Sequence, residues 1–287
     1  MDRRRISISQ PASRILCRTL EAVAWNGRVS QVGTEKQYGT PVEGVSVVVP
    51  TYNESGNVAE LVRRLAAVLD ADLGEILIVD DSTDDTAQVA AESADRVPHR
   101  VRVVRREEPA GGLSGAVLTG MALAVHPWIV VMDGDLQHPP EDLPRLLAAG
   151  EARGADIVAA SRYLDGGSAG GLDGLLRRLV SSGSTLVARA LFPRRLRDCS
   201  DPMTGFFAVR RDALDLASLR PQGFKILLEV LLRHRLTLTE IPFAFGIRTA
   251  GASKATVANG AAFLRQLVVL RFQPSSPRLA QAAAEVV

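Results

Sequence analysis

From residue 45 onward, short runs of apolar, largely β-branched residues alternate with longer segments whose apolar positions recur every three or four residues. The apolar runs predict strands at 45–49, 75–79, 101–104, 128–132 and 156–160. The segments between them predict helices at 54–69, from about 84, at 113–124 and at 140–152. Strict alternation of strands and helices predicts an α/β fold. We expect a doubly wound, Rossmann-like and mostly parallel sheet with helices on both faces.

Charge and cysteine content narrow the class of protein. The 34 basic and 32 acidic side chains nearly balance, which argues against a protein that wraps a nucleic acid. Only three basic residues are lysines, Lys36, Lys225 and Lys254, so arginine dominates, and its planar fork suits phosphate and carboxylate. Cys17 and Cys199 lie far apart without a CxxC spacing, which argues against a metal-thiolate site and favours a reducing compartment.

Two segments invite a membrane interpretation that the sequence does not favour. Residues 110–132 contain no charged side chain, but four glycines and the pair His126-Pro127 divide them into a helical half and a strand. The N-terminus carries Arg3, Arg4 and Arg5 without a following apolar core, so it does not resemble a secretory signal. We therefore expect a cytoplasmic protein, with residues 1–43 as an N-terminal extension and 273–287 as a C-terminal tail.

Polar residues follow the predicted strands, at the sheet edge where ligands of doubly wound folds bind. Neither a P-loop nor a GxGxxG fingerprint follows a strand. Asp133 and Asp135 follow an apolar strand, and two close carboxylates favour a divalent cation between them, with Gln137 as a further oxygen donor. The alternative is a solvated acidic turn. Asp81 could accept hydrogen bonds from a base or ribose, whereas Asp84 suits a helix cap.

Residues 174–197 combine six arginines and no acidic residue with regularly spaced leucine, valine and phenylalanine. A basic amphipathic segment of this kind is typical of helices that lie on anionic membrane surfaces. A core helix with solvated arginines is the alternative. Residues 256–272 form a second candidate surface helix, for which core packing is equally consistent with the sequence.

Seven short motifs lie in order between residues 45 and 272: Val47-Val-Val-Pro-Thr-Tyr-Asn-Glu54, Val79-Asp-Asp81, Met132-Asp-Gly-Asp-Leu-Gln-His-Pro-Pro140, Ser161-Arg-Tyr163, Asp201-Pro-Met-Thr-Gly-Phe206, Gly223-Phe-Lys225 and Ser253-Lys254. This set resembles the family 2 glycosyltransferases, and within them the dolichol-phosphate (polyprenol-phosphate) mannosyltransferases. The resemblance implies a GT-A catalytic domain at residues 44–272, a nucleotide-sugar donor, Mg²⁺ or Mn²⁺ as cofactor, and a polyprenyl monophosphate acceptor at the cytoplasmic face of a membrane.

The resemblance also implies roles for individual positions. The nucleotide sugar would be bound by Pro50, Tyr52, Glu54, Asp81, Asp133, Lys225, Arg248 and Lys254. The metal would be bound by Asp133, Asp135 and Gln137, and the acceptor phosphate by Arg162, Arg177 and Ser181. Asp135 and Arg162 are the expected catalytic residues.

The implied reaction transfers a hexosyl group, mannose from GDP-mannose, to the lipid phosphate with inversion. A phosphate monoester has a second pKa of about 6, so the acceptor is largely a dianion near neutral pH and needs no strong general base. Three alternatives stay open: a glucosyl or other UDP-sugar transferase, a transferase acting on a small soluble acceptor, and a non-catalytic subunit that binds sugar nucleotides. Processive synthases carry a QxxRW motif, which is absent because the only tryptophans are Trp25 and Trp128.

Overall fold

A mixed sheet forms the centre of the structure, which is a computed structural model describing residues 44–168, 170, 175–220, 225–246 and 257–272. In residues 175–182, 257–262 and 264 it describes the helical backbone and not the side chains. Within these ranges seven strands form one sheet: β1 (Val45–Thr51), β2 (Gly74–Asp80), β3 (Arg100–Arg105), β4 (Trp128–Val131), β5 (Ile157–Ser161), β6 (Phe207–Arg210) and β7 (Leu238–Pro242). The five predicted strands are confirmed to within two residues at each end.

The strand order is β3-β2-β1-β4-β6-β5-β7. β1 is parallel to both β2 and β4, and β5 is parallel to β7, whereas β6 runs antiparallel to its neighbours β4 and β5. The sheet is therefore mostly parallel, as expected, but the antiparallel β6 was not anticipated. The chain moves outward in one direction from β1 to β2 and β3, and in the other from β4, so the order reverses between β1 and β4.

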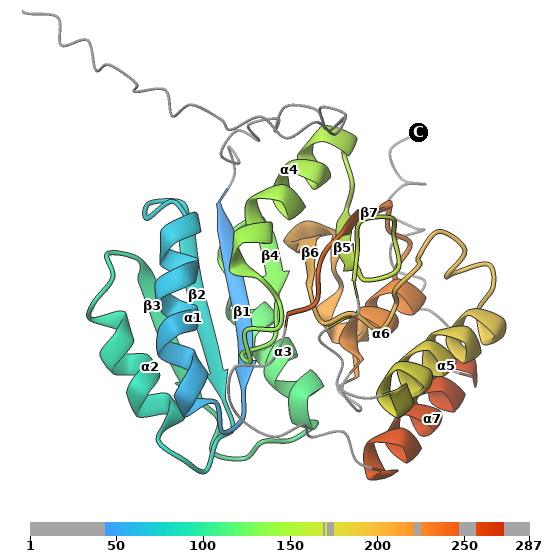
Figure 1. The fold of residues 1–287 in the computed structure, drawn as a ribbon, viewed down its shortest axis with the longest axis horizontal. Helices are drawn as coiled ribbons and strands as arrows, with labels where there is room; N and C mark the ends of the chain where they lie inside the picture. The colour runs from blue at the N-terminus through green and yellow to red at the C-terminus, as the bar shows by residue number, and fades with distance from the viewer. Residues whose placement is uncertain (1–43, 169, 171–174, 221–224, 247–256, 273–287) are drawn as a thin grey trace, which may run out of the picture. The chain divides into compact units, whose positions relative to one another are not determined.

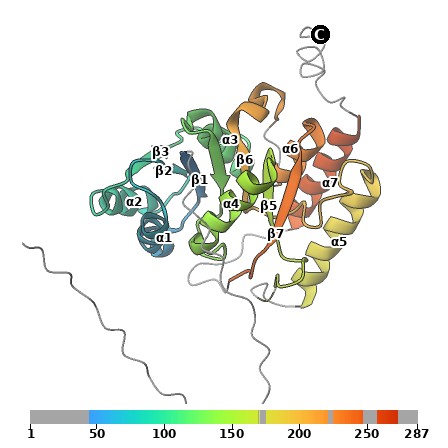
Figure 2. The same ribbon diagram turned by 90° about the horizontal axis from the view of Figure 1, so that it is seen from above.

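Helices cover both faces of the sheet (Figures 1 and 2). They are α1 (Ser55–Val68), α2 (Thr86–Ala94), α3 (Gly112–Leu123), α4 (Leu143–Arg153), α5 (Leu175–Leu191), α6 (Ile226–Arg233) and α7 (Val257–Phe272). Short 3-10 turns lie at Pro140–Asp142, Arg211–Ala213 and Leu216–Ser218, so the helix expected at 140–152 begins as a 3-10 turn.

Two hydrophobic cores result, one on each face. One core packs α1 and α4 against alternate residues of the central strands, with Trp128 among its largest buried side chains. The other packs α3, α6 and the inner residues of α7 against the opposite face, where Met121, Leu227 and Leu267 are buried. β1 and β2 are buried along their whole length, which explains the apolar runs at 47–49 and 76–79; Ser46 and Glu75 are buried with them and hydrogen-bonded to each other.

The direction of β6 decides which loops reach the functional edge. The segments after β1, β2, β4 and β5 leave the sheet at the carboxyl ends of parallel strands, and therefore at one edge. Because β6 is antiparallel, the segment that precedes it, ending at Phe206, arrives at that same edge. Residues 199–206 thus join the loops after β4 and β5.

Candidate active site

The loops after β1 and β4 meet through a glycine at the point where the strand order reverses. A Cβ atom at Gly134 would lie 3.2 Å from Thr51 Cγ2 and 3.6 Å from Glu54 Cγ, so a side chain there would push the two loops apart. Glu54 is buried, its backbone N–H donates to Thr86 Oγ1, and Asn57 Nδ2 donates to its carboxylate at 2.8 Å. Tyr52, which lies directly after β1, is by contrast 47% exposed.

Asp81, which we expected to face the nucleotide, is held by Arg106, an arginine outside the predicted motifs. Arg106 Nε donates to Asp81 Oδ1 at 2.7 Å, and its Nη2 donates to Oδ2 of the same carboxylate. The guanidinium also donates to the carbonyls of Ala110 and Gly112, and so fixes the turn that opens α3. A base or ribose at this edge would therefore meet an ion pair rather than an isolated carboxylate.

The two aspartates after β4 sit on a tightly constrained loop. Asp135 is 6% exposed and its Oδ1 accepts the Gln137 N–H at 3.1 Å, whereas the Asp133 side chain is 38% exposed. Between them and Gln137, Leu136 adopts a left-handed backbone with φ 63°, an unfavourable conformation for a branched side chain. Its side chain is buried in the core on the α1 face, which holds the strained turn in place.

His138 supports the loop of Asp133 and Asp135 through a hydrogen bond and through packing of its ring. Its Nδ1 accepts the backbone N–H of Asp133 at 3.0 Å, which requires Nδ1 to be unprotonated. Burial lowers the pKa of His138, although the charges of Asp133 and Asp135 act to raise it. The ring stacks on Phe206 and meets Phe243 and Phe245 edge-on. His138 thus lies in the aromatic packing under the loop, and we assign it no catalytic role.

A second glycine brings the segment before β6 against Asp133. A Cβ atom at Gly205 would lie 3.0 Å from both carboxylate oxygens of Asp133 and 3.2 Å from His138 Cε1. Gly205 belongs to the motif that begins at Asp201, to which the sequence analysis gave no role. Its lack of a side chain leaves the Asp133 carboxylate accessible from this side.

Gln137 ties the aspartate loop to the chain beyond β7. Its Nε2 donates to the Gly246 carbonyl at 3.0 Å, and the Gly246 N–H donates back to the Gln137 carbonyl at 2.8 Å. Arg248 and Lys254, expected to face the donor diphosphate, follow directly in the sequence but lie outside the described residues. Arg177 and Ser181, expected at the acceptor phosphate, lie on α5, where the structure does not describe their side chains.

Arg162 is the most firmly held cation at this edge. Its Nε and Nη2 donate to the two carboxylate oxygens of Asp201 at 2.7 and 2.9 Å, and its backbone N–H donates to Oδ2 at 3.3 Å. The guanidinium also lies about 5.5 Å from the ring centres of Tyr163 and Phe245. Burial acts to lower the pKa of Arg162, but the hydrogen bond and charge of Asp201 raise it overall. Arg162 is therefore a fixed, permanent charge.

Lys225 lies close enough to Arg162 for the two charges to repel one another. Its Nζ donates to the Met203 carbonyl at 3.0 Å, so it contacts the same segment that carries Asp201. Burial and then the charge of Arg162 lower the pKa of Lys225, and Asp133 and Asp201 act in the opposite direction, with the net result a pKa of about 8. A buried ammonium at this position is poised to lose its proton at mildly alkaline pH.

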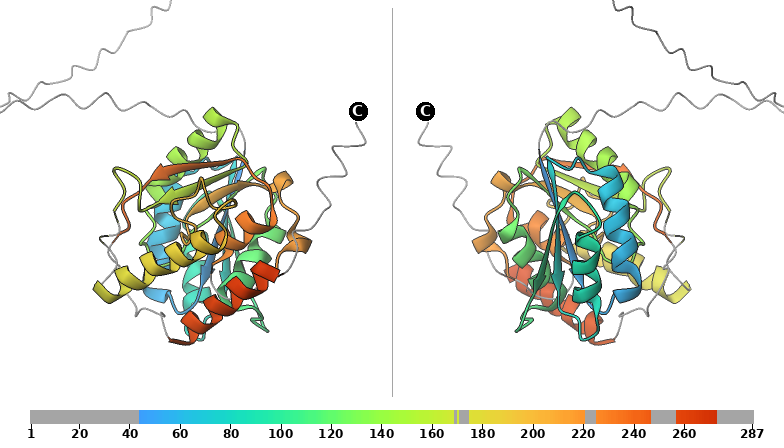
Figure 3. Two further views of the ribbon diagram at one scale, coloured as in Figure 1. Left: turned by 90° about the vertical axis from the view of Figure 1, so that its right-hand side faces the viewer. Right: turned by 90° about the vertical axis from the view of Figure 1, so that its left-hand side faces the viewer.

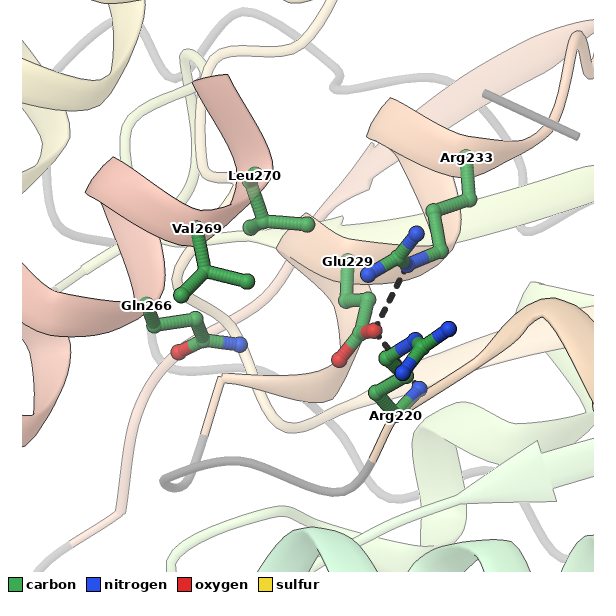
Figure 4. A pocket seen from close by; sticks show the side chains of 6 residues that line it. All are labelled: Arg220, Glu229, Arg233, Gln266, Val269 and Leu270. Atoms are coloured by element: carbon green, nitrogen blue, oxygen red, sulfur yellow. Dashed lines mark hydrogen bonds and ion pairs between the residues drawn. The ribbon is translucent and has the colours of Figure 1, made fainter. Parts of the chain in front are cut away.

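The backbone of Lys225 is anchored from the opposite side by α7. Gln266 Nε2 donates to the Lys225 carbonyl at 3.3 Å, next to a shallow hollow between α6 and α7. Figure 4 shows Glu229 at the centre of this hollow, where its Oε1 accepts from Arg233 Nε and from the backbone N–H of Arg220. These contacts hold the backbones of Arg220 and Lys225 against the side chains of Glu229 and Gln266.

The outer surfaces of α5 and α7 expose apolar side chains among arginines. The two helices lie side by side on the same flank (Figures 1 and 3). Their exposed apolar residues are Leu186, Val187, Leu191, Val268 and Phe272, and their exposed basic residues are Arg189, Arg265 and Arg271. No helix in the described part of the chain combines the length and apolarity needed to cross a bilayer. Both segments expected to be surface helices are thus helical; α5 is amphipathic, whereas the apolar residues of α7 are spread around the helix.

Comparison with known proteins gives a consistent set of relatives. The model of the family described as "Glycosyl transferase family 2" matches residues 46–216. A dolichol-phosphate mannosyltransferase from Pyrococcus furiosus is 43% identical over 73% of this chain, and the match spans 58% of that protein's length. Proteins of the same name from Mycosarcoma maydis and Saccharomyces cerevisiae are 36% and 35% identical over 78% and 77% of this chain, covering 78% and 85% of their own lengths.

Solved structures support the fold assignment. Glucosyl-3-phosphoglycerate synthase from Mycobacterium tuberculosis, in complex with Mn²⁺, UDP and phosphoglyceric acid, superimposes with a TM-score of 0.60 at 21% identity. The similarity covers 82% of this chain and 81% of that one. Another crystal structure of the same synthase is in complex with Mg²⁺ and UDP. At this level of identity the comparison establishes the GT-A architecture.

Proposed function

Because this chain belongs to glycosyl transferase family 2, we propose that it transfers mannose from GDP-mannose to a polyprenyl monophosphate, giving polyprenyl-phosphate mannose. One observation carries the proposal: Asp133 and Asp135 lie at the same sheet edge as two cations, the buried Arg162 and the partly buried Lys225. A reaction between two phosphate-bearing anions needs such a concentration of positive charge. The three mannosyltransferase relatives support the choice of sugar and acceptor.

We assign the donor to the sheet edge formed by the carboxyl ends of β1, β2 and β4. Tyr52 offers an exposed ring on which a base can stack, and the Asp81–Arg106 pair offers hydrogen-bond partners to a base or ribose. Lys225 would bind the diphosphate from the opposite side, together with Arg248 and Lys254.

Asp133 and Asp135 fit a hard divalent cation, Mg²⁺ or Mn²⁺. Within the described residues no group of three or more His, Cys, Asp or Glu side chains converges on one point. Two carboxylates supply only part of a coordination sphere, and Mg²⁺ in phosphate-transferring enzymes is typically held by one or two carboxylates together with water and substrate phosphate oxygens. When bound, the ion would neutralise charge on the departing diphosphate. Gln137 would contribute through its oxygen, because its nitrogen is bonded to Gly246.

Arg162 would receive the acceptor phosphate. Its Nε and one side of Nη2 are used by Asp201, so the guanidinium presents its Nη1 side to an incoming phosphate oxygen. Arg177 and Ser181 would extend this subsite. Since the phosphate is largely a dianion near neutral pH, the site needs no group that removes a proton.

The reaction is then a single displacement at the anomeric carbon. An acceptor phosphate oxygen supplies the electron pair for the new bond to C1, and the bond from C1 to the diphosphate oxygen breaks, leaving that pair on the nucleoside diphosphate. The configuration at C1 inverts. Lys225 would stabilise the new charge on the leaving group as an ammonium. An α-linked lipid product from an α-linked donor would refute this scheme.

We further propose that the surface of α5 and α7 contacts the cytoplasmic face of a membrane. Exposed apolar side chains surrounded by arginines are the features by which amphipathic helices bind anionic lipid. The acceptor's hydrocarbon tail lies in a bilayer, so its phosphate would reach Arg162 most easily from such a surface.

A donor panel tests the proposal directly. Purified protein is incubated with a polyprenyl phosphate, Mn²⁺ and either GDP-mannose, UDP-glucose or UDP-N-acetylglucosamine, and the lipid is analysed by mass spectrometry. We expect a hexosyl product with GDP-mannose, and loss of turnover when Asp135 is replaced by Asn or when EDTA is added. Product from a UDP-sugar alone would favour the glucosyl alternative. Donor binding without turnover on any lipid would favour a non-catalytic subunit.

A further inference from the structure

Glu240 on β7 is a partly buried carboxylate to which the proposed reaction gives no role. It pairs in register with Ala159 of β5 and lies two residues before the end of its strand, close to the edge where the site is built. Its side chain turns toward the segment that precedes β6. That segment runs from Cys199 to Phe206 and carries Asp201.

Several donors converge on the Glu240 carboxylate. The backbone N–H of Ser200 lies 2.9 Å from Oε1 and 3.0 Å from Oε2, and the backbone N–H of Asp201 lies 3.3 Å from Oε1. Ser200 Oγ donates to Oε1 at 3.1 Å, and the Cys199 thiol lies 3.7 Å from the same oxygen. Burial raises the pKa of that thiol, so it keeps its proton and remains a donor.

This set of partners favours a carboxylate, because the Ser200 N–H contacts both oxygens. An ionised carboxylate only accepts hydrogen bonds, and its two oxygens together accept all of these donors. A glutamine of the same shape would replace one oxygen with an NH₂ group, which would face the backbone N–H of Ser200 donor to donor. Hydrogen bonds to a charged acceptor are also shorter and stronger than neutral ones.

The residue held in this way is next to the one that orients Arg162. Asp201 is completely buried and supplies both oxygens of the fork that binds the Arg162 guanidinium. Ser161, which precedes Arg162, is joined to the same turn because its hydroxyl lies 2.6 Å from Ser200 Oγ. Glu240 therefore fixes the backbone on which the Asp201–Arg162 pair depends.

We propose that Glu240 is a positioning residue that sets the orientation of Arg162 toward the acceptor phosphate, acting through Ser200 and Asp201. The inference rests on the proposed function, because that function places the phosphate at Arg162. It predicts that loss of the Glu240 carboxylate weakens the binding of the acceptor and leaves the binding of the nucleotide sugar intact.

The test measures the affinity of the full chain for farnesyl phosphate and, separately, for GDP-mannose with Mn²⁺, both by isothermal titration calorimetry. Glu240→Gln should weaken farnesyl phosphate binding by about 10- to 100-fold, the equivalent of one charge-assisted hydrogen bond. Its effect on GDP-mannose should stay below about twofold. Asp156→Asn is the matched control, because Asp156 Oδ2 accepts the Thr237 N–H at the opposite end of the same strands. It should change neither affinity.

A double-mutant cycle separates positioning from a general structural role. In an Arg162→Lys background, Glu240→Gln should cost little further affinity for farnesyl phosphate, because a lysine cannot form the fork that Asp201 orients. Glu240→Asp, whose shorter side chain withdraws the oxygens from Ser200, should reproduce the effect if the glutamine variant folds poorly.

Three results would overturn the inference: equal losses in both backgrounds, equal losses for donor and acceptor, or no loss in either Glu240 variant. Since the wild-type protein is also assayed for transfer, the two proposals can fail separately. Wild-type protein that transfers mannose while both Glu240 variants bind farnesyl phosphate normally refutes the positioning role alone. Wild-type protein that neither binds nor glycosylates farnesyl phosphate refutes the proposed function, and the inference with it.

Discussion

The pH dependence of donor use should reveal the buried ammonium of Lys225. Burial and the charge of Arg162 lower its pKa to about 8 from an ordinary 10.5, so its charge disappears well inside the range in which the protein can be assayed. The ammonium is the form that binds diphosphate. We therefore expect kcat/KM for GDP-mannose to fall on the alkaline side with a midpoint near pH 8, because this parameter reports ionisations of the free protein.

The size of the expected drop in kcat/KM follows from the pKa of Lys225. With a value of about 8 the ammonium is about 91% populated at pH 7 and about 9% at pH 9, so kcat/KM should drop about tenfold over that interval. Lys225→Arg should abolish the decline, because guanidinium keeps its proton throughout the range. In kcat the decline should move to higher pH, since bound diphosphate favours the charged amine. An unchanged alkaline decline in Lys225→Arg would refute the assignment.

The same ionisation of Lys225 must also change the free energy of unfolding with pH, in a direction that follows from the lowered pKa. Between about pH 8 and 10.5 the unfolded chain binds more protons at this residue than the folded one, so the free energy of unfolding should rise with pH across this window. The gain is at most about 3 kcal/mol. Chemical denaturation of the wild type and Lys225→Met at pH 7.5 and 10 measures it, as the difference between the two proteins. A fall in the wild type relative to the variant would contradict the sign.

Three further predictions test other parts of the site. Asp201→Asn should destabilise the protein by about 3–5 kcal/mol, because it leaves Arg162 as the unpaired partner of a buried ion pair. Thermal unfolding measures this loss. The control is Glu60→Gln in a surface ion pair, which should leave Tm unchanged. Gly205→Ala should weaken Mn²⁺-dependent turnover with a smaller effect on Tm, since the new Cβ would lie 3.0 Å from both Asp133 oxygens; equal turnover at all Mn²⁺ concentrations would exclude this contact as important. Replacing Val268 and Phe272 by Ser and Arg265 by Glu should reduce flotation with anionic liposomes, and unaltered flotation would defeat the proposed membrane surface.

The sequence predicts the first half of the fold well, for a physical reason. β1 and β2 are buried at every position, so their central residues, 47–49 and 76–79, form unbroken apolar runs typical of strands covered on both faces. The later strands carry weaker signals. β6 has four residues, and nothing in Phe207–Arg210 indicates that it runs antiparallel between β4 and β5. That arrangement depends on contacts made across the sheet, which local patterns do not encode.

For the site, too, some features could be predicted from the sequence and others could not. Asp133, Asp135, Arg162 and Lys225 were identified from motifs, and the structure places their elements at one edge. The residues that hold them were missed. Arg106 lies 25 positions from Asp81, and Glu240 lies 40 positions from Ser200, so no spacing rule connects either pair. The sequence around a partly buried carboxylate on a short strand does not show which residue it will bind. Only the tertiary structure shows that.

The place of β6 in the sheet also has a consequence for synthesis on the ribosome. β5 pairs only with β6 and β7 among the described strands, and β4 has β1 as its only other neighbour. Until residues 207–210 leave the exit tunnel, one edge of β4 in the growing polypeptide therefore lacks its hydrogen-bonding partner. β5 has no neighbouring strand at that stage. A fragment that stops at Phe206 would present that edge permanently, so we expect it to aggregate although it contains most of the residues of the donor side.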